Sequence, residues 1–134
     1  MKQAIGKLLI LALVIISLAS VYFFIYYYSS QDVNDVKIEG YVLDSSNSQP
    51  LIDVKVTIIN DRYESDSGYK NYDEYLDQDK IQLRTDYKGY YSTILKKSAY
   101  VYTYIEKDGY KPIEERGKQA QKLIVFKTNM DRVK

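Results

Sequence analysis

Tyrosine and carboxylate groups supply most of the chemistry that this sequence offers. The chain contains 16 tyrosines in 134 residues, whereas histidine, cysteine and tryptophan are absent. Without imidazole and thiol groups, the chain lacks Ser-His triads, thiolate nucleophiles, disulfides and zinc sites built from Cys and His. We therefore expect no catalytic site, no metal and no cofactor, and the sequence predicts a protein that is not an enzyme.

A run of alternating tyrosines is the first candidate binding site. In the segment AYVYTYIEK, residues 99–107, tyrosines occupy alternate positions from 100 to 104, so the rings would share one face of a strand, about 6.7 Å apart. Tyrosine rings stack on sugars and form protein contacts, because each buries a large area at a small cost in entropy. Half-buried packing against neighbouring strands is the structural alternative. The candidate residues are Tyr100, Tyr102 and Tyr104.

A polar segment at residues 61–80, DRYESDSGYKNYDEYLDQDK, is the second candidate site. Seven of its residues are acidic and four are tyrosines. A long tyrosine-rich loop on a rigid scaffold has the composition of a binding loop. Carboxylates at this density could also ligate Ca²⁺ and stabilise an adhesin-like domain, but their spacing matches no EF-hand loop, and a solvated loop is the simpler interpretation. The candidate binding residues here are Tyr69, Tyr72 and Tyr75.

Two further arrangements of reactive side chains are not expected to form sites. The adjacent carboxylates at 73–74 and 114–115 would point apart in an extended chain, which argues against a glycosidase-like pair. Lys37 and Asn129 invite comparison with the isopeptide-forming sandwiches of bacterial surface adhesins. Alternation, however, places Lys37 on the solvent face of its strand, so this bond is not expected either.

The elements that position these residues are short strands separated by turns. From residue 36 onward, β-branched and aromatic residues alternate with polar ones, a pattern typical of an all-β sandwich. We expect a turn at 86–89, with Gly89 free to take a positive φ, to join strands 81–85 and 90–95 as a hairpin. The other expected strands lie at 36–43, 51–59, 99–107, 110–113 and 121–128, which gives a seven-stranded β-sandwich.

An apolar N-terminal segment is predicted to anchor this domain. Residues 8–28, LLILALVIISLASVYFFIYYY, contain no charge, Pro or Gly, and as a helix they are roughly 31 Å long, which matches the hydrocarbon core of a bilayer. The closing tyrosines are typical of an interfacial aromatic belt, and Lys2 and Lys7 before the span predict a signal anchor with a cytoplasmic N-terminus. A secretory signal cleaved after residues 17–19 is the alternative, and it would also export the domain.

The predicted organisation has one transmembrane helix and one exported domain. We expect a cytoplasmic stub at 1–7, the transmembrane helix at 8–28, a stem at 29–35, the β-sandwich at 36–128 and a C-terminal tail at 129–134. The 19 basic residues nearly balance the 18 acidic ones, unlike the clustered positive charge of a nucleic-acid-binding domain. We therefore expect a membrane protein without a nucleic-acid partner.

Four segments follow one another in this domain: KIEGYVLD, QPLIDVKVTI, LRTDYKGYYS and YVYTYIEKDGYKP. In this order they resemble the carboxypeptidase regulatory-like domain family, a transthyretin-like (prealbumin-like, Ig-like) β-sandwich. The resemblance covers about residues 36–115, and the 61–80 segment is longer than the family's usual excursion. The family pattern falls on Gly40, Val42 and Asp44, on Pro50, Leu51, Val54 and Val56, on Thr85, Asp86, Gly89 and Tyr91, and on Gly109 and Tyr110.

The resemblance implies an accessory module without a catalytic site of its own, found in exported proteins, beside peptidases or in cell-envelope receptors. The related transthyretin-like hydrolase of purine breakdown depends on histidines, which this chain lacks. We expect a single-pass membrane protein whose extracytoplasmic domain, periplasmic or at the cell surface, binds or scaffolds another envelope protein. A glycan-binding module that uses the same tyrosines is the alternative.

Overall fold

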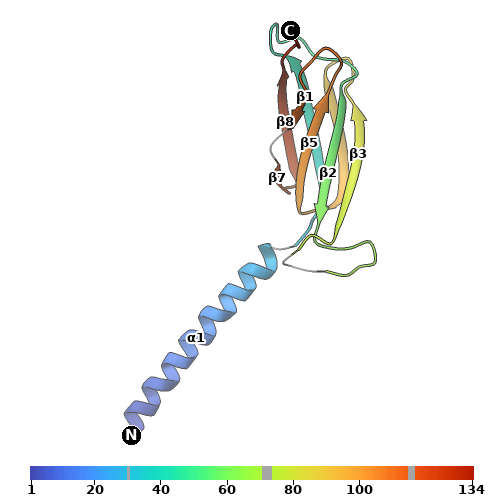
Figure 1. Cartoon of the computed structure of the whole chain (residues 1–134). Coiled ribbons are helices and arrows are strands. Elements are labelled where there is room, and N and C mark those ends of the chain that lie inside the picture. The colour runs from blue at the N-terminus through green and yellow to red at the C-terminus, as the bar shows by residue number, and fades with distance from the viewer. Residues whose placement is uncertain (30, 71–73, 115–116) are drawn as a thin grey trace. The chain divides into compact units, whose positions relative to one another are not determined.

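The computed structural model describes residues 1–29, 31–70, 74–114 and 117–134. Within these residues the chain forms two compact units, Met1–Gln31 and Asp32–Lys134. The first unit is a single helix and the second is built from strands (Figure 1).

The N-terminal unit is the helix α1, Lys2–Ser29, which begins inside the predicted stub. Its segment Lys2–Tyr27 is long and apolar enough to cross a membrane, a property that signal sequences share. Its apolar residues lie on all sides of the helix and none of that segment is buried in the structure, as expected for a helix that lipid surrounds. The hydroxyl of Ser20 donates to the carbonyl oxygen of Ile16 at 2.8 Å, so this polar group is satisfied without water.

The second unit consists of two sheets (Figure 1). The smaller sheet has the order β4-β1-β8, in which β1 runs antiparallel to β4 and parallel to β8. The larger sheet has the order β3-β2-β5-β6, and β7 also pairs with β5. The strands are β1 Val33–Asp44, β2 Lys55–Arg62, β3 Asp77–Arg84, β4 Tyr90–Ser98, β5 Tyr100–Glu106, β6 Ile113–Glu114, β7 Lys118–Gln119 and β8 Leu123–Met130.

The described residues thus form eight strands, and the prediction of seven is wrong. The strand that was not predicted is β7, which has two polar residues and no apolar alternation. Its backbone is extended because Val101 and Tyr100 of β5 pair with it. The pattern of apolar and polar residues does not predict such a strand, because it forms through pairing with a neighbouring strand.

One hydrophobic core lies between the two sheets. Each long strand contributes alternate residues to it, as expected where two sheets pack face to face. The two sheets therefore form a sandwich around a shared core. Its members in the strands include Val36, Ile38, Val42, Val56, Ile58, Tyr91, Leu95, Val101, Ile105, Ile124, Phe126 and Met130.

The turn at 86–89 forms, but the hairpin predicted around it is wrong. The N–H of Gly89, at φ 69°, donates to the carbonyl of Asp86 at 3.0 Å. However, β3 pairs with β2 and β4 pairs with β1, so the turn connects strands of opposite sheets. A Cβ on Gly89 would lie 2.5 Å from the carbonyl oxygen of Val42. The glycine therefore serves a close crossing between layers as well as a turn.

The second predicted strand and the predicted insertion both shift along the chain. Residues 51–54 precede β2, with Asp53 at φ 60°, and β2 then continues to Arg62. Strand β3 begins at Asp77, so the ends of the 61–80 segment are paired strands and the loop between them spans 63–76. The sequence of β3 resembles a loop because one of its faces is exposed and polar.

The end of the sandwich at which β1 and β8 finish is closed by hydrogen bonds around a buried carboxylate. The Tyr110 hydroxyl donates to Asp44 at 2.6 Å, and Nε of Arg132 donates to the same oxygen at 2.8 Å. Asp44 is 1% exposed. The N–H of Val133 also donates to the carbonyl of Gly109 at 2.9 Å. Residues 129–134 therefore bond to the domain, although the sequence predicts them as a tail.

The remaining residues of the motif pattern also lie at tight positions of the fold. Gly40 faces Tyr91 across β1 and β4, and a Cβ on Gly40 would overlap the tyrosine ring. Pro50 forms an isolated antiparallel bridge with Leu43. The Thr85 hydroxyl accepts from the N–H of Val54 at 2.9 Å. Gly40 permits a close approach and Thr85 satisfies a backbone group, and the structural role of the motif residues stays a prediction.

Candidate binding surface

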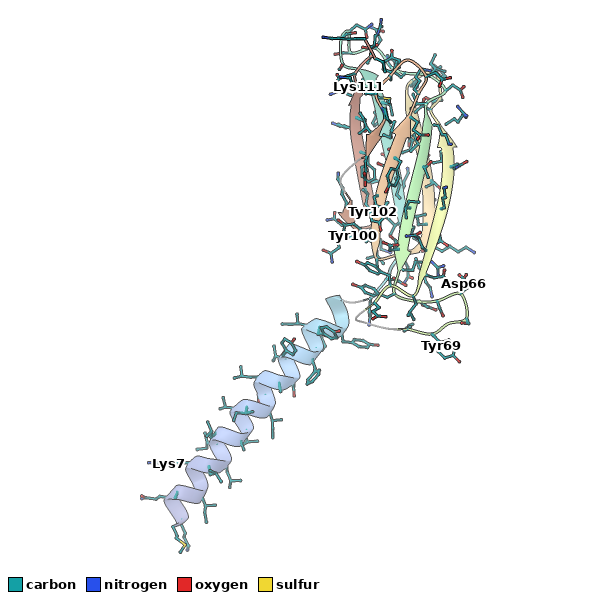
Figure 2. The ribbon with its side chains drawn as sticks, viewed as in Figure 1. Lys7, Asp66, Tyr69, Tyr100, Tyr102 and Lys111 are labelled. Atoms are coloured by element: carbon teal, nitrogen blue, oxygen red, sulfur yellow. The ribbon has the colours of Figure 1, made fainter. Side chains whose placement is uncertain are left out.

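Three tyrosines of β5 share the outer face of the larger sheet. Tyr104 is 38% exposed, whereas Tyr100 and Tyr102 are half-buried (Figure 2). The rings of Tyr100 and Tyr102 meet edge to face, with centroids 5.5 Å apart. The alternate residues of the strand, Val101, Thr103 and Ile105, face the core. The alternation predicted from the sequence is thus present, and the role of the tyrosines in binding stays a prediction.

Carboxylates lie beside two of the three hydroxyl groups of this face, those of Tyr102 and Tyr104. The Tyr102 hydroxyl donates to the carboxylate of Asp61 on β2, whose other oxygen accepts from Nε2 of Gln78 at 2.8 Å. The Asp61 carboxylate, together with burial, raises the pKa of Tyr102 to about 12. The charge of Glu114 likewise raises the pKa of Tyr104. Both phenols therefore keep their protons at neutral pH, and the bond to Asp61 fixes the orientation of the Tyr102 side chain.

The loop at 63–76 brings further tyrosines to the same end of the domain. The ring of Tyr75 lies against that of Tyr63, with centroids 5.0 Å apart, and burial raises the pKa of Tyr75. The neighbouring Tyr63 and the Asp61 carboxylate add to that rise in pKa. Tyr69 is 74% exposed and lies well away from Tyr100 in the view of Figure 2. Tyr72, also predicted as a binding residue, lies outside the described residues.

The loop is tied to the start of the domain. The backbone N–H groups of Tyr63 and Glu64 donate to the carboxylate of Asp32, at 2.8 and 3.1 Å. At its other end, the N–H of Leu76 donates to the carbonyl of Arg62 at 2.9 Å. Both ends of the loop are thus fixed to the sandwich.

A buried arginine, which the sequence analysis missed, organises the acidic residues of this region. The side chain of Arg62 is 10% exposed; its Nε donates to Asp79 at 2.8 Å and its Nη2 to Asp66 at 2.8 Å. Its Nη1 donates to the carbonyl of Glu64 at 3.0 Å. Three of the carboxylates considered as calcium ligands, Asp66, Asp77 and Asp79, therefore lie around a guanidinium. Across the part of the chain that the structure describes, no group of three or more acidic side chains is placed to hold a metal ion.

A signal for Arg62 was present in the alternation of β2. The inward positions of that strand are Val56, Ile58, Asn60 and Arg62, all of them buried. An arginine that continues an inward-facing register requires buried acceptors, because an unpaired charge is costly away from water. The boundary predicted at residue 61 hid this register.

The two sheets leave a groove between β3 and β4. Its volume is about 730 Å³. Asn60 and Arg62 of β2 lie on its inner side, and Ile81 of β3 and Ile94 of β4 line its walls. Nζ of Lys97 bonds to Glu64 across it at 2.5 Å. The groove therefore combines apolar, cationic and hydrogen-bonding groups.

Comparisons with known proteins identify the fold. No protein-family model matches the chain, and no curated protein sequence matches it either. Among solved structures, catechol 1,2-dioxygenase from Acinetobacter sp. ADP1 is similar with a TM-score of 0.57 and 10% identity, over 75% of this chain and 53% of that one. The 3-chlorocatechol 1,2-dioxygenase from Rhodococcus opacus 1CP has a TM-score of 0.53 and 16% identity, over 77% and 61%. This chain therefore spans less than two thirds of the length of either enzyme.

A pilus backbone protein shares the fold as well. The backbone protein of the group B streptococcus pilus 2b is similar with a TM-score of 0.51 and 13% identity, over 75% of this chain and 42% of that one. At such identities the similarity shows the sandwich fold alone. The carboxypeptidase regulatory-like family suggested by the sequence motifs is not established by these comparisons.

The prediction that this protein is not an enzyme is contradicted by these neighbours. Dioxygenases are among the solved structures that share its fold, so the fold itself does not argue against catalysis. The absence of histidine and cysteine excludes particular mechanisms and no more. Because one fold hosts many functions, the similarity also assigns no activity to this chain.

Proposed function

We propose that this protein is a single-pass membrane protein whose β-sandwich lies outside the cytoplasm and binds or scaffolds another protein of the cell envelope. The domain would be a carboxypeptidase regulatory-like, transthyretin-like module. The observation that carries the proposal is the face of aromatic rings held in place on β5, with Tyr102 bonded to Asp61. The alternative that this face binds a glycan is an outcome of the experiment below.

The anchor is supported by the composition of α1 and its flanks. The helix is apolar on all sides and of membrane-spanning length. Lys2 and Lys7 lie near its N-terminus, and Asp32 and Asp35 are the first charged residues after it. The positive-inside rule then leaves the N-terminus in the cytoplasm and the sandwich on the other side.

A protein partner is supported by the rigidity of the tyrosine face. Aromatic side chains are frequent at the energetic centres of interfaces, since they bury large areas and have few rotatable bonds. Here the Tyr102 hydroxyl already has an acceptor and the Tyr100 ring packs against Tyr102, so part of the entropy cost of binding is met in the free protein. The occupied hydroxyl of Tyr102 leaves its ring as the group for a partner to contact.

Proximity labelling from the full-length protein in its own membrane tests this function. We expect a labelled envelope protein that is lost in a Tyr102→Ala, Tyr104→Ala double variant. Tyr87→Ala is the matched control, because Tyr87 is 71% exposed and lies in the turn between β3 and β4. Equal labelling in all three proteins contradicts the proposed surface. Retention of the wild type on a polysaccharide column, lost in the double variant, would indicate a glycan instead.

A further inference from the structure

The groove between β3 and β4 lies at an open edge of the sandwich. Among the described residues, β3 pairs with β2 alone and β4 pairs with β1 alone. Each therefore has one edge along which no other strand pairs, although the Lys97 carbonyl of β4 accepts from the side chain of Asn60. Free strand edges are templates for a further strand, and many recognition domains bind extended peptides in this way.

A buried hydrogen-bond acceptor on the inner side of the groove has no partner. Asn60 is 1% exposed, and its Nδ2 donates to Asp79 at 3.1 Å and to the carbonyl of Lys97 at 2.8 Å. These two acceptors fix the orientation of the amide, since a flipped amide would turn its oxygen toward them. Its Oδ1 is buried and unbonded. An N–H group from a molecule in the groove would satisfy it.

The charges in the groove are only partly balanced. Arg62 is paired with Asp79 and Asp66, and Lys97 is paired with Glu64. The other two lysines that line the groove are Lys80 on β3 and Lys96 on β4. Both are exposed, and neither forms an ion pair with a described residue. One exposed cation without an ion-pair partner among the described residues therefore lies on each edge strand beside the groove, which favours a ligand with carboxylates.

We propose that this groove binds an extended, acidic peptide segment of another protein, which adds a strand to the free edges of β3 and β4. Peptide N–H groups would reach Asn60, and carboxylates would pair with Lys80 and Lys96. Apolar side chains of the same segment would rest on Ile81 and on Ile94, which is 66% exposed. The proposal rests on the proposed protein-binding function but uses none of the tyrosines of β5, which lie on the outer face of the larger sheet.

Hydrogen exchange and fluorescence anisotropy on the full chain in nanodiscs of uncharged lipid test this proposal. The probes are two synthetic peptides, one of alternating Val and Glu and one of alternating Val and Lys. We expect the Glu peptide to bind at least tenfold more tightly than the Lys peptide. We also expect it to slow exchange of backbone amides in 77–84 and 90–98 at least tenfold, because a bound strand covers them.

Charge reversal separates this site from non-specific attraction. A Lys80→Glu, Lys96→Glu variant is expected to bind the Glu peptide at least tenfold more weakly than the wild type does, and to bind the Lys peptide more tightly than the Glu peptide. Lys127→Glu, a change of an exposed lysine on β8 outside the groove, should leave both affinities unchanged. Absence of protection in 77–84 and 90–98, or equal affinity for the two peptides, overturns the proposal. The Tyr102→Ala, Tyr104→Ala variant should bind the Glu peptide as the wild type does. This result would show that peptide binding in the groove does not depend on the tyrosines of β5, whose role is tested separately by proximity labelling.

Discussion

Replacing Arg62 with methionine is expected to destabilise the domain by about 3 kcal/mol. The guanidinium is 10% exposed and donates twice to Asp79, once to Asp66 and once to a backbone carbonyl. A shielded hydrogen bond to a charged group contributes about 1.5–3 kcal/mol, whereas an exposed ion pair contributes about 0–1 kcal/mol. Asp66 is 80% exposed and Asp79 is 43% exposed. Most of the loss therefore comes from the paired bonds to Asp79.

Urea unfolding of the full chain in detergent, followed by the near-UV circular dichroism of the tyrosines, measures this loss. Urea is suitable because, unlike guanidinium chloride, it does not screen ion pairs. Arg84→Met is the matched control, since it removes the same group from β3. Arg84 is 59% exposed and lies 3.5 Å from Asp53, which is 70% exposed. Arg84→Met should lower the free energy of unfolding by less than about 0.5 kcal/mol.

The comparison of the two variants decides whether the argument from burial is sound. Equal destabilisation by Arg62→Met and Arg84→Met would show that the acidic loop does not depend on the buried arginine. A double-mutant cycle with Asp79→Ala adds a second criterion. Its coupling energy should lie at about 1–3 kcal/mol, because the two side chains share a bidentate contact.

Three further outcomes are expected. Gly40→Ala forces a Cβ into the ring of its cross-strand tyrosine and should cost about 1–3 kcal/mol in the same unfolding assay; an unchanged midpoint would contradict this packing. Hydrogen bonds from Ser46, and further ones around it, hold the pKa of Asp44 well below its ordinary 3.8. The pKa of Asp44 is therefore lower in the folded than in the unfolded state. Its carboxylate stabilises the domain above about pH 3.8, and this stabilisation is lost as the pH falls below that value. In Asp44→Asn, the free energy of unfolding should depend less steeply on pH in the acidic range. An unchanged pH dependence would argue against stabilisation by the Asp44 carboxylate. The Asp61 hydrogen bond raises the pKa of Tyr102 to about 12. Protonated Tyr102 therefore stabilises the domain below pH 10.0, the ordinary tyrosine pKa, and this stabilisation is lost as the pH rises toward about 12. Asp61→Asn should return one tyrosine to ordinary titration in an ultraviolet absorbance experiment, and an identical titration curve would exclude the bond.

The fold that these residues build is shared by proteins of different function. Dioxygenases and a pilus backbone protein have similar sandwiches. A sandwich supplies a rigid frame, and function depends on the loops and edges added to it. In this chain the added features are the tyrosines of β5, the loop at 63–76 and the groove between β3 and β4. The experiments above therefore address these features.

Local chemistry was readable from the sequence. The alternation of β5 predicted that its tyrosines share one face, and in the structure the residues of the opposite face, Val101, Thr103 and Ile105, are buried in the core. The turn at 86–89 was also predictable, because glycine and the Asp86 side chain act on the backbone within a few residues, where the Asp86 carboxylate accepts from the N–H of Lys88 at 2.8 Å. The apolar N-terminal helix follows from composition alone.

Only the tertiary structure decided which strands share a sheet and which distant charges meet. The turn after β3 could not reveal that β4 crosses to the other sheet and pairs with β1. Nor could the sequence reveal that Arg132 closes on Asp44, or that Arg62 gathers the acidic loop. Periodicity reports which side of a strand is apolar, a property of adjacent residues. The choice of partner depends on the packing free energy of the whole core, to which residues far apart along the chain contribute together.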